Sequence, residues 1–321
     1  MSRPLHVWTS HHHPVPLPRG HRFPIGKHAP LIARLLAEGV VRAEDVHPAE
    51  PTPIEWLALA HDREYLARAL ERGLDPADER RLGLPWSPAL GRRARAAVDG
   101  TVRAAFAALE HGVAGNLAGG SHHAFRDHGE AYCLLNDVAV AIAVLRAHGH
   151  ARRPFVADLD VHQGNGTAVM FADDPSVFTF SIHAGSNYPL HKARGSLDVA
   201  LPDRTGDDAY LAALDKHLPA ALERHAPDLV FYQAGVDALA ADRLGRLALS
   251  HAGLAERDAR LFAACAGLPV VVTLGGGYSD PLDASIEAHA AVWRAARRAR
   301  DRRPVAGPAR PVHPGDALPT A

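Results

Sequence analysis

The feature that most constrains this chain is a series of short apolar runs separated by helical patterns. The runs are rich in Val, Phe and Ile and end at polar or glycine residues, at 155–158, 177–182, 229–233 and 269–274. Short apolar runs without polar alternation are typical of strands buried on both faces. Their alternation with helices predicts a doubly wound α/β fold, with a central, mainly parallel sheet flanked by helices on both faces.

Capping residues indicate where the intervening helices begin. Asn136 precedes a helical pattern over 138–148, and Ser87 precedes a long Ala- and Arg-rich pattern over 88–111. A third pattern begins at the aspartates 207–208 and reaches about residue 224. These helices fill the intervals between the predicted strands, as the α/β fold requires.

Length and composition fit one large domain. The chain has 321 residues, 47% of them hydrophobic, which is enough for a sizeable core. Its 35 basic and 36 acidic residues give a net charge of −1, which argues against a nucleic-acid-binding surface. The two cysteines provide no disulfide framework, so we expect a reduced, cytoplasmic location. No run approaches the ~18 apolar residues of a membrane span.

The end of the chain differs from the rest. Residues 301–321 contain five prolines and lack an apolar face. We therefore predict one domain over residues 1–300, followed by a Pro-rich flexible tail over 301–321.

Polar motifs follow the predicted strands. Asp158, Asp160 and His162 come at the end of the first, Asp237 follows the third, and Tyr278 follows the fourth. Open α/β sheets bind ligands outside the carboxyl ends of their strands, so we expect one shared site.

Asp160, His162 and Asp237 provide two carboxylates and one imidazole. Three protein ligands leave a position open for water and substrate, as in catalytic zinc sites. The same donors suit ferrous iron, so the identity of the metal stays open. An alternative is that the aspartates of this Asp-x-Asp-x-His motif only cap a helix or form a turn.

Two further motifs could supply acid–base chemistry. His122 and His123 follow two glycines, and adjacent histidines on a loop can face one cavity, one as general base and the other as a charge-stabilising group. The glycines 275–277 lack the spacing of a phosphate-binding loop, so we expect them to present the Tyr278 hydroxyl to a developing oxyanion. The structural alternative for the two histidines is a polar loop, and that for Tyr278 is a tight turn with a packed tyrosine.

We expect residues 11–13, three histidines, to form a solvated loop and Cys133 to be a buried core residue.

Taken in order, the motifs resemble those of the histone deacetylase superfamily, which includes bacterial acetoin-utilisation proteins and acetylpolyamine amidohydrolases. The match covers about 21–293 and consists of six motifs, which begin at His21, Gly119, Tyr132, Asp158, Ala234 and Leu274. The resemblance implies that residues 1–300 form a single arginase-like catalytic domain that hydrolyses N-acyl amines. The sequence His162-Gln163-Gly164-Asn165 is similar to that of the class IV and bacterial acetoin-utilisation branch.

The resemblance also implies roles for individual residues. Zn²⁺, or Fe²⁺, would be bound by Asp160, His162 and Asp237. His122 and His123 would flank the catalytic water, with His123 as general base, and Tyr278 would stabilise the oxyanion. Asp158 would orient His122, and a structural potassium ion would be held by Asp158, Asp160, His162, Ser181 and Ile182. The substrate tunnel would be lined by Tyr132, Tyr188, Gly276 and Arg22, with Arg22 deep in the channel where acetate leaves.

Asn165 departs from class I members of the superfamily, which carry an aspartate there. A neutral neighbour stabilises imidazolium less, so we expect His123 to be less basic than with a carboxylate partner. Asn165 thus counts among the catalytic residues.

The expected substrate is acyl-lysine of proteins, and the alternative is an acetylpolyamine or another small N-acyl amine. A polyamine enzyme usually needs acidic residues at the tunnel mouth, for which Glu130 and Asp127 are the candidates. A dimetal ureohydrolase would need extra carboxylates around 122–125, where this chain has none. A non-catalytic acyl-amine binder would be expected to lose Tyr278 or a histidine, and both are present. The sequence does not predict the oligomeric state.

Overall fold

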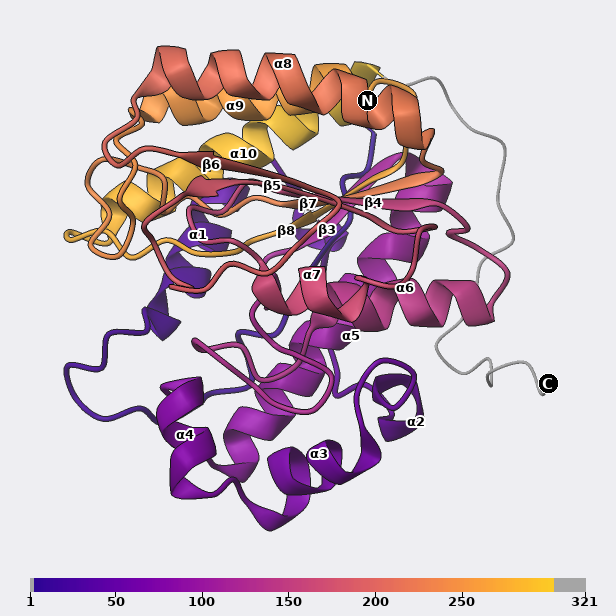
Figure 1. Ribbon diagram of the computed structural model, residues 1–321, viewed down its shortest axis with the longest axis vertical. Coiled ribbons are helices and arrows are strands. Elements are labelled where there is room, and N and C mark those ends of the chain that lie inside the picture. Colours follow the sequence, from indigo (N-terminus) through magenta and orange to yellow (C-terminus); the bar gives the residue numbers. More distant parts are fainter. Residues whose placement is uncertain (1–2, 303–321) are drawn as a thin grey trace.

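Eight parallel strands form the central sheet of the computed structural model (Figure 1), which describes residues 3–302. Their order is β2-β1-β3-β8-β7-β4-β5-β6. The strands are β1 (Val7–Thr9), β2 (Val46–Pro48), β3 (Val113–Asn116), β4 (Pro154–Asp158), β5 (Phe178–Ala184), β6 (Leu197–Leu201), β7 (Leu229–Gln233) and β8 (Val270–Thr273). Every adjacent pair is parallel, which confirms the predicted sheet.

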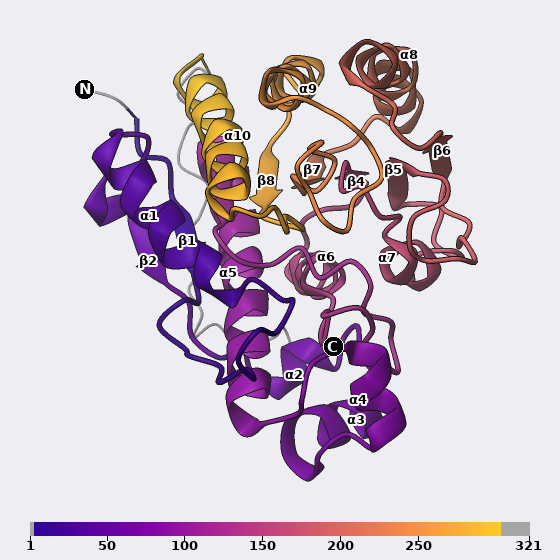
Figure 2. The ribbon, with the colours of Figure 1, turned by 90° about the vertical axis from the view of Figure 1, so that its left-hand side faces the viewer.

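Helices cover both faces of the sheet (Figure 2). One face carries α1 (His28–Ala37), α8 (Asp207–His225), α9 (His251–Ala264) and α10 (Asp283–Arg302). The other carries α5 (Pro88–His111), α6 (Asp137–Ala147) and α7 (Asn165–Met170). The short helices α2 (Ile54–Leu57), α3 (Arg63–Ala67) and α4 (Pro76–Leu82) gather beyond α5 on this second side. Helical turns at Ile25–Lys27, Ala43–Asp45 and Arg68–Arg72 complete the described elements.

The sheet separates two hydrophobic cores. Val270 and Val272 of β8 pack into one core and Val271 into the other, because successive side chains of a strand point to opposite faces. Burial on both faces explains why the central strands β4, β7 and β8 are apolar except at the residue that ends each of them. The predicted doubly wound α/β class is confirmed.

Both predicted helix caps are present. The Ser87 side chain accepts a hydrogen bond from the backbone N–H of Leu90 (3.1 Å), and that of Asn136 accepts one from Ala139 (3.0 Å). Strands β1, β2, β3 and β6 were not predicted. The first three have only three or four residues and β6 has a mixed sequence, so none of them forms a long continuous apolar run.

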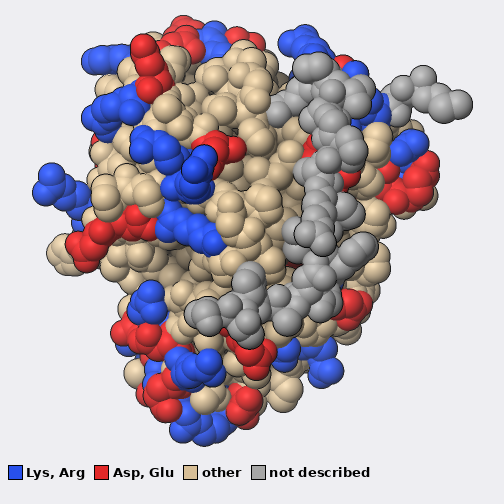
Figure 3. Space-filling model, turned by 90° about the vertical axis from the view of Figure 1, so that its right-hand side faces the viewer, with Lys and Arg blue, Asp and Glu red and all other residues tan. Residues whose placement is uncertain are grey.

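The predicted boundary at residue 300 falls inside α10, which continues to Arg302. The rest of the predicted tail, 303–321, lies outside the described residues. Within residues 3–302, no helix has both the length and the apolar character needed to cross a membrane. On the face in Figure 3, acidic and basic side chains lie interspersed, as the balanced composition leads one to expect.

Candidate active site

A cavity of about 620 Å³ lies at the carboxyl ends of the strands. Segments that follow β3, β4, β5, β7 and β8 contribute to its wall, although they are far apart in sequence. The predicted site residues that line it are His122, His123, Tyr132, Asp160, His162, Tyr188, Asp237, Gly276 and Tyr278. Parallel strands thus bring the separate motifs to one place, as the strand-end argument predicts.

Asp160, His162 and Asp237 converge within the cavity wall. The first two follow β4 and the third follows β7, which is paired with β4 in the sheet. The Nδ1 atom of His162 lies 3.1 Å from Oδ1 of Asp160 and 3.1 Å from Oδ2 of Asp237. One donor atom from each residue lies within 4.8 Å of the others, and all three side chains are buried.

Backbone groups fix the two carboxylates. Oδ1 of Asp237 accepts a hydrogen bond from the N–H of Val161 (2.9 Å), and Oδ2 of Asp160 accepts one from Gly276 (2.9 Å). A Cβ atom on Gly276 would lie 2.0 Å from Oδ2 of Asp237, so this close approach requires glycine.

Burial and mutual electrostatic contacts shift the pKa values of this group. Burial and the neighbouring Asp160 raise the pKa of Asp237 to about 7. Burial favours a neutral His162, but Asp160 and Asp237 prevail and raise its pKa to about 10. Two buried carboxylates facing one imidazole nitrogen fit a divalent metal such as zinc or ferrous iron, which would offset their repulsion.

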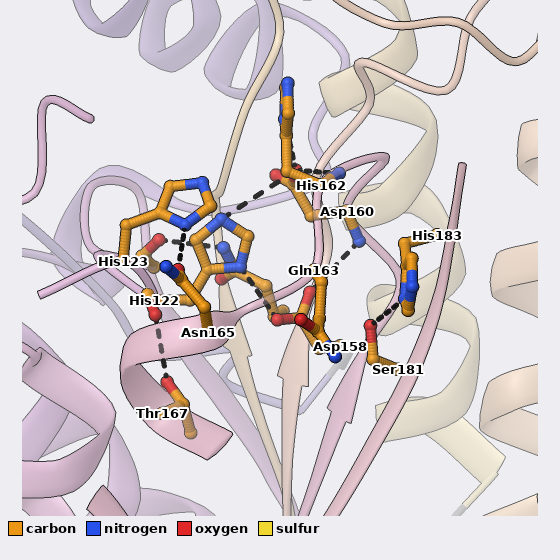
Figure 4. A network of polar contacts seen from close by, with 12 residues as sticks. His122, His123, Asp158, Asp160, His162, Gln163, Asn165, Thr167, Ser181 and His183 are labelled. Atoms are coloured by element: carbon orange, nitrogen blue, oxygen red, sulfur yellow. Dashed lines mark hydrogen bonds and ion pairs between the residues drawn. The ribbon is translucent and has the colours of Figure 1, made fainter. Parts of the chain in front are cut away.

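His122 and His123 differ in their hydrogen-bond partners (Figure 4). Nδ1 of His122 lies 2.7 Å from Oδ2 of Asp158, whereas Nδ1 of His123 lies 2.6 Å from Oδ1 of Asn165. Burial lowers the pKa of both imidazoles, but the carboxylates of Asp158 and Asp160 raise that of His122 to about 9. Burial and the adjacent histidines hold the pKa of His123 well below its ordinary value.

Aromatic side chains complete the wall. Tyr278 follows β8, and its backbone N–H donates to Asp242 (2.6 Å). Its ring centroid lies 6.1 Å from that of Tyr132, and the ring of Tyr188 lies edge-on to His123 at 5.2 Å. The structure therefore brings all three predicted tyrosines to the cavity.

Arg22 does not lie where the sequence placed it. It is exposed and absent from the cavity wall, whereas Lys27 is buried and lines the cavity. Lys27 Nζ donates to the carbonyl oxygen of Gly275 (2.9 Å) and lies 5.9 Å from the Tyr278 ring centroid. Burial lowers the pKa of Lys27 to about 8, against the opposing effect of nearby aspartates. A lysine between a glycine and a histidine gives no sequence signal of burial, and so it was missed.

The predicted potassium ligands lie beside the metal group. Asp158 is paired in register with Ser181 across β4 and β5, and both border a small cavity of about 10 Å³. Ser181 Oγ lies 2.9 Å from Nδ1 of His183. Ile182 packs its side chain into the first core, so only its backbone oxygen could contribute. The other two predicted ligands, Asp160 and His162, lie on the loop that follows β4, on either side of Val161. Occupancy by potassium stays a prediction.

Glu130 is the polar residue whose position the sequence did not reveal. Its carboxylate accepts a hydrogen bond from Asn165 Nδ2 (2.9 Å) and another from the Tyr188 hydroxyl. Asp127 is exposed and contacts His128 instead. No motif spacing connects residue 130 with residue 165, because only the tertiary fold brings these loops together.

Two other groups need mention, a cluster of metal-binding side chains away from the cavity and a cysteine in the cavity wall. His12 and His13, which follow β1, and Glu50, which follows β2, have donor atoms within 4.8 Å of one another. Cys133 is buried, and burial raises the pKa of its thiol, as for an unreactive core cysteine.

A parallel α/β domain with carboxylates, histidines and a tyrosine at its strand ends has the architecture of the arginase–deacetylase fold. The family model of the histone deacetylase domain matches residues 21–295, and the chain belongs to the histone deacetylase family.

The chain is 45% identical to an uncharacterised protein of Picosynechococcus, over 88% of this chain and 95% of that protein. It is 31% identical to the histone deacetylase-like amidohydrolase of Pseudomonas aeruginosa, over 78% of this chain and 70% of that protein. The fold is similar to the crystal structure of an HDAC homologue from Aquifex aeolicus, with a TM-score of 0.78, 24% identity, and coverage of 91% of this chain and 83% of that one.

Proposed function

We propose that this protein is a metal-dependent deacylase that removes acetyl or longer acyl groups from acylated amines, above all from acyl-lysine of proteins. The observation that carries the proposal is the convergence of Asp160, His162 and Asp237 beside a histidine pair in one cavity. Membership in the histone deacetylase family, which includes an amidohydrolase relative, supports amide hydrolysis as the class of reaction.

Asp160, His162 and Asp237 would hold Zn²⁺ or Fe²⁺. When bound, such a metal polarises an amide carbonyl and lowers the pKa of water. The three protein donors leave room for substrate, and the cavity provides the space in front of them.

The two histidines would divide the proton transfers. His123 is neutral, and Nδ1 is occupied by Asn165, so Nε2 is the nitrogen that accepts the proton of the attacking water. His122, whose charged form Asp158 stabilises, would support the developing negative charge. A protonated histidine then returns a proton to the leaving amine, which otherwise departs poorly.

Tyr278 and Lys27 would act on the acyl side. The Tyr278 hydroxyl would donate a hydrogen bond to the substrate carbonyl and then to the tetrahedral oxyanion. Lys27, and not Arg22, would be the cation that meets the carboxylate product at the inner end of the cavity. Tyr132 and Tyr188 would flank the acyl-lysine chain.

Two features outside the reaction belong to the same proposal. A potassium ion held around Asp158 and Ser181 would stabilise the loop that carries Asp160 and His162. Residues 1–300 would form the catalytic domain of a cytoplasmic enzyme.

A small acylated amine, such as an acetylpolyamine, is the second candidate substrate. A cationic polyamine would be expected to meet carboxylates at the mouth of the cavity. Of the two candidates, Glu130 has its carboxylate occupied by Asn165 and Tyr188, and Asp127 contacts His128. This arrangement favours acyl-lysine. A non-catalytic binding protein would not need the complete set of acid, base and metal-binding groups.

A substrate panel tests the proposal. The protein loaded with Zn²⁺ or Fe²⁺ is assayed on acetyl-lysine peptides, longer acyl-lysine peptides and acetylated polyamines, with bound metal quantified. We expect turnover of acyl-lysine peptides. Absence of turnover on every amide by the metal-loaded protein would refute the hydrolase proposal.

A further inference from the structure

Asn165 lies between His123 and a carboxylate. Its Oδ1 faces Nδ1 of His123 at 2.6 Å, and its Nδ2 donates to Oε1 of Glu130 at 2.9 Å. An amide has a donor end and an acceptor end of nearly equal shape, so a neutral Asn could bind either tautomer of a histidine. An ionised carboxylate only accepts, and it therefore binds only the NH₂ end of the amide.

We propose that Glu130 is a positioning residue, whose carboxylate orients the Asn165 amide and thereby holds His123 in the tautomer with its proton on Nδ1. With Asn165 Oδ1 turned towards the imidazole, Nδ1 must be the donor and Nε2 carries the lone pair. The consequence for catalysis rests on the proposed function, because it requires His123 to act as the base.

Several contacts hold Glu130 in this position. Its side chain is 15% exposed, and Oε2 lies 3.8 Å from Nε2 of His128. The Tyr188 hydroxyl donates to the same oxygen as Asn165, which connects the tunnel wall to the base. Burial raises the pKa of Glu130, but the nearby His128 and the hydrogen bonds from Tyr188 and Asn165 outweigh it and keep the pKa low. The group is therefore an anion at neutral pH.

The backbone around Glu130 is strained in the way that functional turns often are. Glu130 and Cys133 exchange backbone hydrogen bonds of 3.0 and 2.8 Å across a tight turn. The two residues between them, Ala131 and Tyr132, have φ angles of 44° and 69°. Left-handed conformations are unfavourable for residues other than glycine and persist where the surroundings impose them. The turn directs Glu130 to Asn165 and places Tyr132 in the cavity wall.

A double-mutant cycle tests the proposal. In the wild-type background, Glu130→Gln replaces an acceptor-only group by an amide that can bind either end of Asn165, so we expect kcat/KM to fall roughly tenfold. Asn165→Asp supplies a carboxylate that accepts from Nδ1 by itself, but it places two like charges side by side. In that background Glu130→Gln should therefore raise kcat/KM.

This reversal of sign distinguishes positioning through Asn165 from a purely structural role. A side chain that only supports the turn would cost activity in both backgrounds. Glu64→Gln is the matched control, because it makes the same change at an exposed carboxylate that pairs with Arg72, and it should leave kcat/KM unchanged. Bound metal and melting temperature are compared across all variants.

Nuclear magnetic resonance of ¹⁵N-histidine-labelled, zinc-loaded protein gives a readout that does not depend on turnover. The Nδ1–H resonance of His123, assigned with His123→Asn, should be sharp in the wild type and weakened in Glu130→Gln. Loss of equal size in both backgrounds, or an unchanged tautomer, would overturn the role of Glu130. A wild type with the expected tautomer and no amide turnover would instead contradict the proposed function.

Discussion

Nδ1 of His122 lies 2.7 Å from a carboxylate oxygen of Asp158, whereas the same atom of His123 faces an amide oxygen. The carboxylate raises the pKa of His122 to about 9, and burial beside other histidines lowers that of His123. Two adjacent residues of the same type therefore differ in charge near neutral pH. This difference supports a division of work, with His123 as base and His122 as the stabilising cation.

The first prediction concerns the pH dependence of the base. A carboxylate at position 165 favours imidazolium and raises the pKa of His123. A base must be neutral to accept a proton, so raising its pKa moves the acidic limb of the kcat/KM profile to higher pH. We expect this shift for Asn165→Asp/Glu130→Gln relative to Glu130→Gln, measured between about pH 5 and pH 8. An acidic limb that coincides in the two proteins would exclude His123 as the group that titrates.

The second prediction concerns the metal. Asp237→Asn removes one of two carboxylates that face His162, so we expect bound metal and amidase activity to be lost together. A chelator should lower the melting temperature of the wild type, because binding at about 100 times Kd adds ~2.7 kcal/mol to the folded state. The melting temperature of Asp237→Asn should not respond to the chelator.

Surface binding needs its own control, because His12, His13 and Glu50 also form a possible metal group. His12→Ala should leave activity and the chelator response unchanged. If Asp237→Asn kept one tightly bound metal per chain and His12→Ala lost it, the metal would have been assigned to the wrong residues.

The third prediction concerns the oxyanion. Tyr278→Phe removes a hydroxyl from the cavity wall without changing the ring that packs near Tyr132. We expect kcat to fall ~10²–10³-fold, as for loss of one oxyanion donor, with metal content unchanged. Tyr132→Phe is the matched control, since it removes a hydroxyl from the same wall and should have a smaller effect on kcat. Equal losses in the two variants would argue against a special role for Tyr278.

The central strands and the shared site could be predicted because both depend on patterns among residues that are close together in the sequence. Apolar runs buried on both faces, such as Leu229–Gln233, are visible in the chain itself. Motifs directly after such strands must meet, because parallel strands end at one edge of the sheet. Short outer strands such as Val7–Thr9 lack this signal, since their pairing and not their composition makes them strands.

Contacts between loops could not be predicted in the same way. Glu130 reaches Asn165 only because the strained turn and the start of α7 come together in the fold. Likewise, Arg22 and Lys27 are both cations in one segment, and only packing decides which is buried. The motif at His21 therefore lies in a segment that contributes to the cavity wall, and the cation of this segment that reaches the wall is Lys27.

The last prediction concerns this buried cation. Lys27 is 4% exposed and lines the cavity, so its charge can meet the carboxylate released from the acyl group. Lys27→Met should weaken product inhibition by acetate, while Arg22→Gln, a change at an exposed residue of the same segment, should not. The pKa of Lys27 is lowered to about 8, first by burial, and the ammonium form predominates below that value. The Ki for acetate in the wild type should therefore rise as pH increases through about 8. In Lys27→Met this dependence should disappear, and its persistence would show that another group holds the carboxylate.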